Sequence, residues 1–295
     1  MLNGQGTQRL STTIHALRLG TITLDASFLL EGRSPGTLRT IDTRAFVISA
    51  PGLNPILVDT GFRSPAVIER LGMNAEITDD CALDAQLARL GLTRQDIGMV
   101  VLTHLHVDHA GHVHDFDTST PVLVNRRELD FAVGGVQGLF YAPEDIHHVL
   151  ERVYTPGAVR FLDFTTDVPI EIAPGVFCER AGGHTPGMMF VRVSTDDGIA
   201  TICSDVVYDA VDQLAGQGRA APGGEPLVSN NFVGSIAEER AAIKRALHNT
   251  TFLLPSHSCG VRLSEGRVVD VLDDWSNNWR ASKRSGVSIP SVNQS

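Results

Sequence analysis

Four histidines and an aspartate crowd residues 103–112, THLHVDHAGH, in a chain with only eleven histidines. His104, His106, Asp108 and His109 form the pattern H-x-H-x-D-H directly after an apolar run. A loop that leaves a strand can turn these side chains toward one small volume. Imidazole nitrogens and carboxylates are good ligands for Zn²⁺, Fe²⁺ or Mn²⁺. The pattern therefore predicts a metal site rather than a polar loop whose histidines face water.

Further ligands are needed if this segment is to complete two metal sites. Three candidates occur later in the chain: His184 in GGHTPG, Asp205 in CSDVVY and His257 in PSHSCG. Each is expected where a strand finishes, and open α/β folds assemble their sites at such strand ends.

The ordered motifs H-x-H-x-D-H, G-H-T-P-G, S-D and a late S-H resemble those of the metallo-β-lactamase superfamily. ILVDTG, at residues 56–61, resembles the first strand pair of that family, so the resemblance runs from Arg44 to Gly260. It implies an α/β fold, the αβ/βα sandwich, with two divalent metal ions at one edge and Zn²⁺ as the expected metal. The ligands that it implies are, for one ion, His104, His106 and His184; for the other, Asp108, His109 and His257; and, bridging both, Asp205.

Asp59, within ILVDTG, has two interpretations. The family resemblance implies a buried carboxylate that orients a ligand histidine. A turn aspartate that bonds to the backbone of Thr60 and Gly61 would leave the same sequence pattern.

A pair of such ions predicts hydrolysis. Two metals about 3.5–4 Å apart can share a bridging hydroxide, because metal coordination lowers the pKa of water to about 7. This hydroxide would attack an acyl carbon, and an alkoxide, thiolate or amine would leave. The chain contains no G-x-S-x-G motif, so a serine-hydrolase route has no support.

Tyr208 follows Asp205 by three positions, which resembles the N-acyl homoserine lactonase branch of the superfamily. The resemblance implies that the Tyr208 hydroxyl donates a hydrogen bond to the lactone carbonyl or ring oxygen, and that Asp108 protonates the leaving alkoxide. The alternative is that Tyr208 only packs beneath the site. His112 and Met188 depart from the residues usual in that branch, although neither stands at a ligand position. The leading hypothesis is a lactonase that opens an N-acyl homoserine lactone or another small lactone, such as a pyridoxolactone.

Other activities of the superfamily remain alternatives. A thioesterase of glyoxalase II type would be expected to carry a basic C-terminal region, whereas residues 265–295 are mixed in sign. An amidase acting on β-lactam-like rings and a mono-iron dioxygenase are the other candidates. A phosphodiesterase acting on nucleic acid would favour a basic surface, and the formal charge of −10 argues against it.

Strands and helices alternate around these motifs. Arg44–Phe62 predicts two strands joined by a turn, and short strands are expected before His104, His184, Asp205 and His257, the last being the final strand. The list of expected helices comprises residues 64–72, 82–92 and 235–247, the last with a capping box of Ser235 and Glu238. Residues 120–132 are expected to form a strand followed by a further helix. No linker divides the chain, so a single domain over residues 1–295 is expected, with residues 1–12 as a flexible extension.

Two segments are expected to cover the site. Residues 134–157 have scattered aromatics and no clean period, and residues 215–232 form a loop rich in glycine and proline. They hold residues whose roles the sequence leaves open: Phe140, Tyr141, Asn230, Asn231 and Phe232. Apolar side chains with a few amides suit a small cyclic ester or an acyl-lactone, although ordinary loop packing explains any single one of them.

Composition narrows the setting. The four cysteines, Cys81, Cys178, Cys203 and Cys259, form no C-x-x-C and are expected to be reduced thiols. No secretory signal and no apolar run of the roughly 18–20 residues of a membrane span is present, so a cytoplasmic enzyme without membrane or nucleic-acid partners is expected. A homodimer is compatible with this size, and no segment selects an interface.

Overall fold

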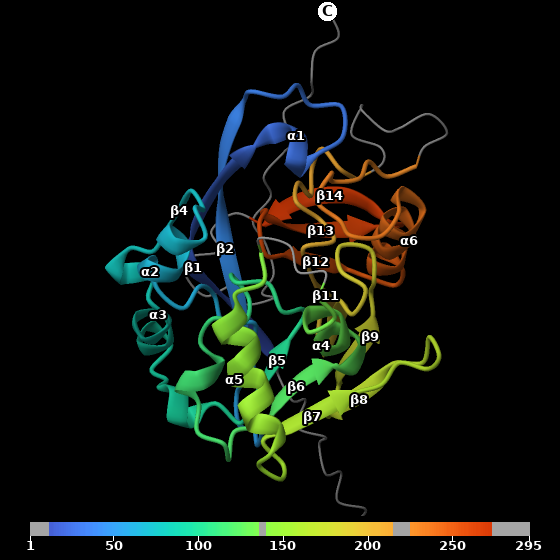
Figure 1. Ribbon diagram of the computed structural model, residues 1–295. Coiled ribbons are helices and arrows are strands. Elements are labelled where there is room, and N and C mark those ends of the chain that lie inside the picture. Colours follow the sequence, from blue (N-terminus) through green and yellow to red (C-terminus); the bar gives the residue numbers. More distant parts are fainter. Residues whose placement is uncertain (1–11, 136–139, 215–224, 273–295) are drawn as a thin grey trace, which may run out of the picture.

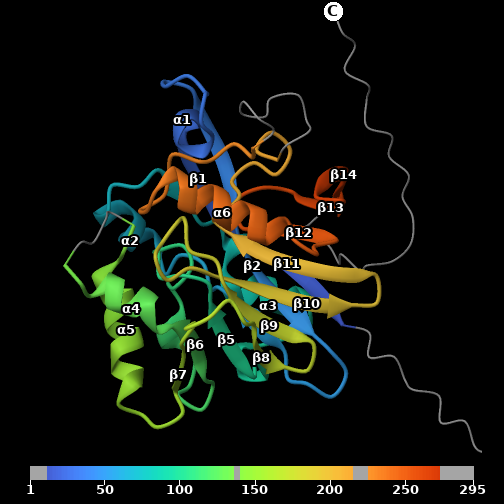
Figure 2. The same cartoon turned by 90° about the vertical axis from the view of Figure 1, so that its right-hand side faces the viewer.

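Two seven-stranded sheets pack face to face in the computed structural model, which describes residues 12–135, 140–214 and 225–272 (Figure 1). The strands of the first sheet lie in the order β4-β1-β2-β3-β5-β6-β7, and those of the second in the order β14-β13-β12-β11-β10-β9-β8. Helices cover the outer faces, as the turned view shows for α6 over the second sheet (Figure 2). The expected αβ/βα sandwich is confirmed.

The first sheet contains β1 (Thr13–Asp25), β2 (Leu38–Ser49), β3 (Ile56–Val58), β4 (Ala75–Glu76), β5 (Met99–Leu102), β6 (Val122–Asn125) and β7 (Val159–Leu162). The second contains β8 (Ile170–Ala173), β9 (Val176–Arg180), β10 (Met189–Thr195), β11 (Gly198–Ser204), β12 (Phe252–Pro255), β13 (Gly260–Ser264) and β14 (Arg267–Leu272). The helices are α1 (Ala26–Leu29), α2 (Pro65–Arg70), α3 (Leu83–Arg89), α4 (Arg126–Ala132), α5 (Pro143–Val153) and α6 (Ile236–Leu247).

The central strands are apolar on both faces because each face packs on a different layer. Val101 of β5 points into the core between the sheets, where it joins Ile202 of β11. Its neighbours Val100 and Leu102 point the other way and pack with Leu87 of α3. Side chains alternate between the two faces of a strand, so a continuous run of valine and leucine is what a doubly covered strand requires.

Parallel pairing places the site. Strands β3, β5, β6 and β7 are parallel to one another, and β11 is parallel to β12. The carboxyl ends of parallel strands lie at the same edge of a sheet. The segments that follow β3, β5, β11 and β12 therefore meet, and these segments carry the residues singled out by the sequence.

The segment at residues 134–157 differs from expectation. Its described part contains α5, an eleven-residue helix with Pro143 at its start and acidic residues in its first turn. Ile146 and Val149 form its buried face. Phe140 lies just before the helix, and its backbone carbonyl accepts a hydrogen bond from the backbone N–H of Val107. The proline, the acidic first turn and the apolar residues three positions apart were the signals of a helix that surrounding glycines and aromatics obscured.

A second difference concerns the end of the chain. β12 is not the final strand, because the β13–β14 hairpin follows and extends the second sheet. Part of the predicted loop at residues 215–232 and nearly all of the extension at residues 1–12 lie outside the described residues. The described remainder of the loop, from residue 225 to residue 232, contains no helix.

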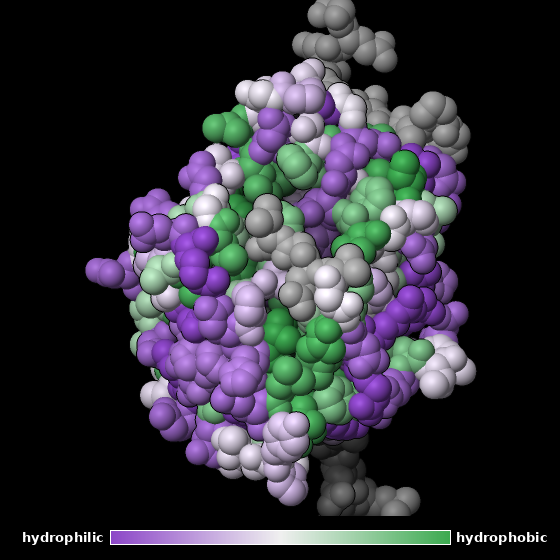
Figure 3. All heavy atoms as spheres, viewed as in Figure 1, coloured by the Kyte–Doolittle hydropathy of each residue, from purple (hydrophilic) through white to green (hydrophobic). Residues whose placement is uncertain are grey.

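Polar side chains are spread over much of the face seen in Figure 3, with hydrophobic groups interspersed. No helix in the described part of the chain is long and apolar enough to cross a membrane.

One pH effect follows from the way α5 is docked. Asp145 is fully buried beside Arg63, with 2.9 Å between Oδ1 and Nε. Burial, which Arg63 only partly offsets, raises the pKa of Asp145 from 3.8 to about 6. The stability that its protonated form contributes is present below pH 3.8 and is lost as the pH rises through 6.

Asp145→Asn should therefore gain stability relative to the native protein as the pH rises, by up to about 3 kcal/mol. Urea unfolding of both proteins between pH 4 and 8 measures this difference. Glu144→Gln, at the half-exposed neighbouring position, is the matched control and should change much less. A difference between Asp145→Asn and the native protein that does not vary with pH would contradict the assignment.

Candidate metal centre

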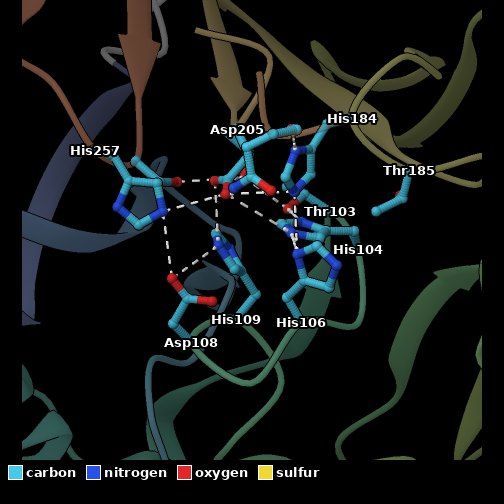
Figure 4. Close-up of polar contacts among 12 residues, drawn as sticks. Thr103, His104, His106, Asp108, His109, His184, Thr185, Asp205 and His257 are labelled. Carbon is cyan, nitrogen blue, oxygen red and sulfur yellow. Dashed lines mark hydrogen bonds and ion pairs between the residues drawn. The ribbon is translucent and has the colours of Figure 1, made fainter. Parts of the chain in front are cut away.

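Seven side chains from four strand ends converge in one buried volume (Figure 4). His104, His106, Asp108 and His109 lie on the loop after β5. His184 precedes β10, Asp205 follows β11 and His257 follows β12. The structure thus brings together every residue that the sequence put forward as a ligand. They form two groups, each with donor atoms within 4.8 Å of one another.

The first group consists of three imidazoles and Asp205. The Nδ1 atom of His106 lies 3.0 Å from the Nε2 atom of His104 and 3.0 Å from the Nε2 atom of His184. All three rings are at most 5% exposed. Three ring nitrogens that point at one another cannot all be satisfied by hydrogen bonds among themselves, whereas they would surround a cation well.

The second group contains Asp108, His109 and His257. Asp108 Oδ2 lies 3.3 Å from Nε2 of His257 and 3.6 Å from Nε2 of His109. His109 Nε2 is buried and makes no hydrogen bond of acceptable geometry with any described residue. A buried nitrogen without a hydrogen-bond partner, in a group of possible metal ligands, fits a position at which a cation binds.

Asp205 lies between the two groups. Its Oδ1 atom is 3.2 Å from Nε2 of His109, and its Oδ2 atom is 3.2 Å from Nε2 of His257. Oδ2 is also 3.6 Å from Nε2 of His184 and 3.9 Å from Nε2 of His104. One carboxylate therefore faces both groups, the position from which it could bridge two cations.

Hydrogen bonds on the outer side of three rings orient them. The Nδ1 atoms of His184 and His257 lie 2.6 Å and 2.8 Å from the backbone carbonyl oxygens of Asn231 and Asp42. A carbonyl oxygen only accepts, so both Nδ1 atoms must carry a proton, and both Nε2 atoms face the centre, where each could bind a cation once it carries no proton. Neither partner could be found from the sequence, because main-chain carbonyls leave no residue-type signal.

Asp59 orients the third ring. Its Oδ2 atom is 2.9 Å from Nδ1 of His109, and its Oδ1 atom accepts the backbone N–H of Thr103 at 2.8 Å. The residue is completely buried and has a φ of 62°, in the left-handed region that non-glycine residues rarely adopt. Asp59 is therefore the orienting carboxylate of the two interpretations, and its bonds to the segment after β5 stabilise an unfavourable backbone conformation.

The electrostatics of the residues fit cations. Burial, together with the neighbouring imidazoles, lowers the pKa of His104 and His106, so both rings are neutral and free to coordinate. Burial also lowers the pKa of His257, but Asp205 and Asp108 outweigh it and raise this pKa to about 10. The two buried carboxylates thus demand positive charge, which protons supply in the metal-free protein and divalent cations would supply in its place.

Tyr208 reaches the same centre. Its hydroxyl donates to Oδ2 of Asp205 at 2.7 Å and accepts from Nδ2 of Asn231 at 2.8 Å. Its ring stacks on His257 with an interplanar angle of 4°. Burial and the adjacent Asp205 raise the pKa of Tyr208, so the hydroxyl keeps its proton.

Several other residues noted in the sequence lie apart from the centre or support it. His112 and His114 both contact Asp115, and Met188 is buried in the core between the second sheet and α6. The ring of Phe140 lies 5.5 Å from that of His106. The described cysteines are all free.

Residues 43–257 match the family model described as the metallo-beta-lactamase superfamily. An N-acyl homoserine lactonase of Bacillus thuringiensis is 27% identical over 205 residues, which is 66% of this chain and 76% of the relative. The N-acyl homoserine lactonase AiiB of Agrobacterium fabrum (strain C58) is 33% identical over 178 residues, 58% of this chain and 62% of the relative.

Solved structures share the fold. An N-acyl homoserine lactone hydrolase with N-hexanoyl-L-homoserine at its catalytic metal centre superimposes with a TM-score of 0.65 at 20% identity, covering 84% of this chain and 94% of that one. The dizinc quorum-quenching lactonase AidC gives a TM-score of 0.62 at 16% identity, covering 90% of this chain and 96% of that one. At these identities the likeness concerns the fold alone.

Replacing the carboxylate shared by both groups tests the centre directly. Asp205→Ala should lower the metal content of purified protein from two divalent ions per chain to one or fewer, since both groups lose a ligand. Elemental analysis after metal-controlled growth measures this stoichiometry. Asp196→Ala, in the exposed turn between β10 and β11, is the control and should keep both ions. Full metal content in Asp205→Ala would reject a bridging role.

Proposed function

Because the chain belongs to the metallo-β-lactamase superfamily, we propose that it is a metal-dependent hydrolase that opens a lactone ring. The substrate class is an N-acyl homoserine lactone or another small lactone, such as a pyridoxolactone. One observation carries the proposal: the Tyr208 hydroxyl lies 2.7 Å from Asp205, the carboxylate that both histidine groups face. An ester bound over the groups would therefore meet a phenolic donor.

Two divalent cations, most simply Zn²⁺, would be held by His104, His106 and His184 on one side and by Asp108, His109 and His257 on the other, with Asp205 between them. When bound, they would supply an activated water and polarise the carbonyl of the ester. The chain's own residues hold the substrate and handle the protons.

Tyr208 is the proposed donor to the substrate. Asn231 donates to its hydroxyl oxygen and thereby directs the hydroxyl proton toward Asp205 and the centre. A hydroxyl that stays protonated can donate to the lactone carbonyl or ring oxygen as negative charge develops there. A hydrogen bond to a developing charge is stronger in a site that excludes water than in bulk water. Tyr208 is only 4% exposed and lies in such a site.

Asp108 is the proposed acid for the leaving alkoxide. Its carboxylate is 6% exposed and lies at the side of the centre formed by His257. Ring opening produces an alkoxide, which must gain a proton before the hydroxy acid leaves. Asp108 would pass on the proton released when water is activated.

The relatives support this choice of bond. The named curated relatives are N-acyl homoserine lactonases, and one structural neighbour holds N-hexanoyl-L-homoserine, a ring-opened product, at its metal centre. Thioester and β-lactam-type amide hydrolysis use the same activated water and remain alternatives within the superfamily.

The test is a substrate panel with protein loaded with zinc. Acyl homoserine lactones of several chain lengths, a pyridoxolactone, a glutathione thioester and a β-lactam are compared by the acid released on hydrolysis. We expect lactones to have the highest kcat/KM. Faster turnover of the thioester or the β-lactam, or a single iron per chain with no hydrolysis, would replace the proposal with the corresponding alternative.

Tyr208→Phe removes only the hydroxyl and should lower kcat for a lactone by up to about 100-fold, because one donor to the developing charge is lost. Metal content should stay unchanged, since the phenol is not among the proposed ligands. Tyr154→Phe is the matched control, because Tyr154 is 89% exposed at the end of α5. If kcat is unaffected by Tyr208→Phe, the tyrosine only packs beneath the site.

A further inference from the structure

Glu128 is a completely buried carboxylate on α4 that belongs to neither group of proposed metal ligands. It lies in the first turn of α4, on the side that faces the loops of the first histidine group. Burying a carboxylate is costly unless hydrogen bonds satisfy it, so its partners indicate why it is there.

Four donors surround the carboxylate, two for each oxygen. Oε1 accepts the backbone N–H of Leu105 at 3.1 Å and the hydroxyl of Tyr141 at 2.8 Å. Oε2 accepts the hydroxyl of Thr185 at 2.7 Å and the backbone N–H of Gly187 at 3.1 Å. These donors come from three segments that are far apart in the sequence.

Each donor adjoins the three-histidine group. Leu105 is the residue between His104 and His106, and Thr185 directly follows His184. The ring of Tyr141 lies edge-on to the ring of His106, with centroids 4.6 Å apart. The Glu128 side chain therefore makes hydrogen bonds to the His104–His106 loop, to the His184 loop and to Tyr141.

The contact between α4 and the His184 loop is unusually close. Asn125, the N-cap of α4, donates its side-chain amide to the carbonyl of Gly187 at 2.7 Å. A Cβ atom on Gly187 would lie 2.1 Å from the backbone nitrogen of Glu128, so only glycine fits there. This glycine lets the loop approach near enough for both bonds to Oε2.

We propose that Glu128 is a positioning residue for the three-histidine cation site: it sets the spacing between the His104–His106 loop and the His184 loop. The inference rests on the proposed function in one respect, namely that these histidines hold a cation. Because Glu128 joins no ligand ring directly, it acts by fixing the backbone from which the rings extend.

Glutamine at this position cannot replace the carboxylate. Each oxygen accepts one backbone N–H, from Leu105 or from Gly187, and a backbone N–H can only donate. In either orientation, the amide nitrogen of glutamine would face one of these N–H groups. One of the two ligand loops must then move away.

The first experiment compares metal binding by Glu128→Gln with that by Asp130→Asn, which removes the same charge from the exposed side of α4. Metal-free proteins are titrated with Zn²⁺ against a chromophoric chelator, and the absorption spectrum of Co²⁺-loaded protein reports ligand geometry. Glu128→Gln should lower the affinity for one of the two cations by roughly 10- to 100-fold and should alter the Co²⁺ absorption spectrum. Asp130→Asn should match the native protein.

A milder pair of variants decides the matter if Glu128→Gln fails to fold. Thr185→Ala removes one donor and should lower the affinity for the same cation by less than Glu128→Gln does. Thr185→Ser restores the hydroxyl and should restore the affinity. The inference would be overturned if the folded variants that lose a hydrogen bond to the carboxylate kept the native affinity for Zn²⁺ and the native Co²⁺ spectrum. This would hold even if the melting temperature of the metal-free protein fell. A native chain that binds no cation would instead reject the proposed function.

Discussion

A buried carboxylate shared by four imidazole rings is the constraint on which the rest of the structure depends. Asp205 is 2% exposed, and ring nitrogens of both groups face its two oxygens. Two buried acids and several inward lone pairs would be unfavourable unless positive charge were placed among them. The arrangement of these side chains is therefore suited to binding cations.

The ligands must stay in fixed positions to bind cations. Hydrogen bonds to the outer sides of the ligand rings and to the backbone of their loops provide this rigidity. Asp59 secures His109 and the segment after β5, and Glu128 secures the loops on either side of the first group. Both are buried carboxylates from the first sheet and its helices. Backbone carbonyls of Asp42 and Asn231 orient the rings contributed by the second sheet. Each half of the sandwich thus contributes both ligands and the groups that orient them.

One residue, Asn231, connects a proposed metal ligand with the proposed substrate donor. Asn231 links the two functions, since its carbonyl fixes His184 and its amide fixes the hydroxyl of Tyr208. A shift of this residue would therefore disturb a proposed ligand and the proposed substrate donor together. The Tyr208 hydroxyl lies against Asp205, while its ring stacks on His257. In the proposed lactone hydrolysis, an oxygen of the ester would develop negative charge beside that hydroxyl.

The sequence alone singled out the proposed ligands, because strand-ending motifs and imidazole-rich spacing are local signals that chemistry restricts to few residue types. The layered fold was implied by the resemblance of these motifs to those of a known family. The capping box of Ser235 and Glu238 and the strand before His104 were equally readable. The sequence alone did not determine the helix α5 or the strands β13 and β14. Their patterns become unambiguous only when the packing around them is known. Only the tertiary structure decided the role of Asp59 and revealed Glu128, since a carboxylate that joins three distant segments has no signature until those segments meet.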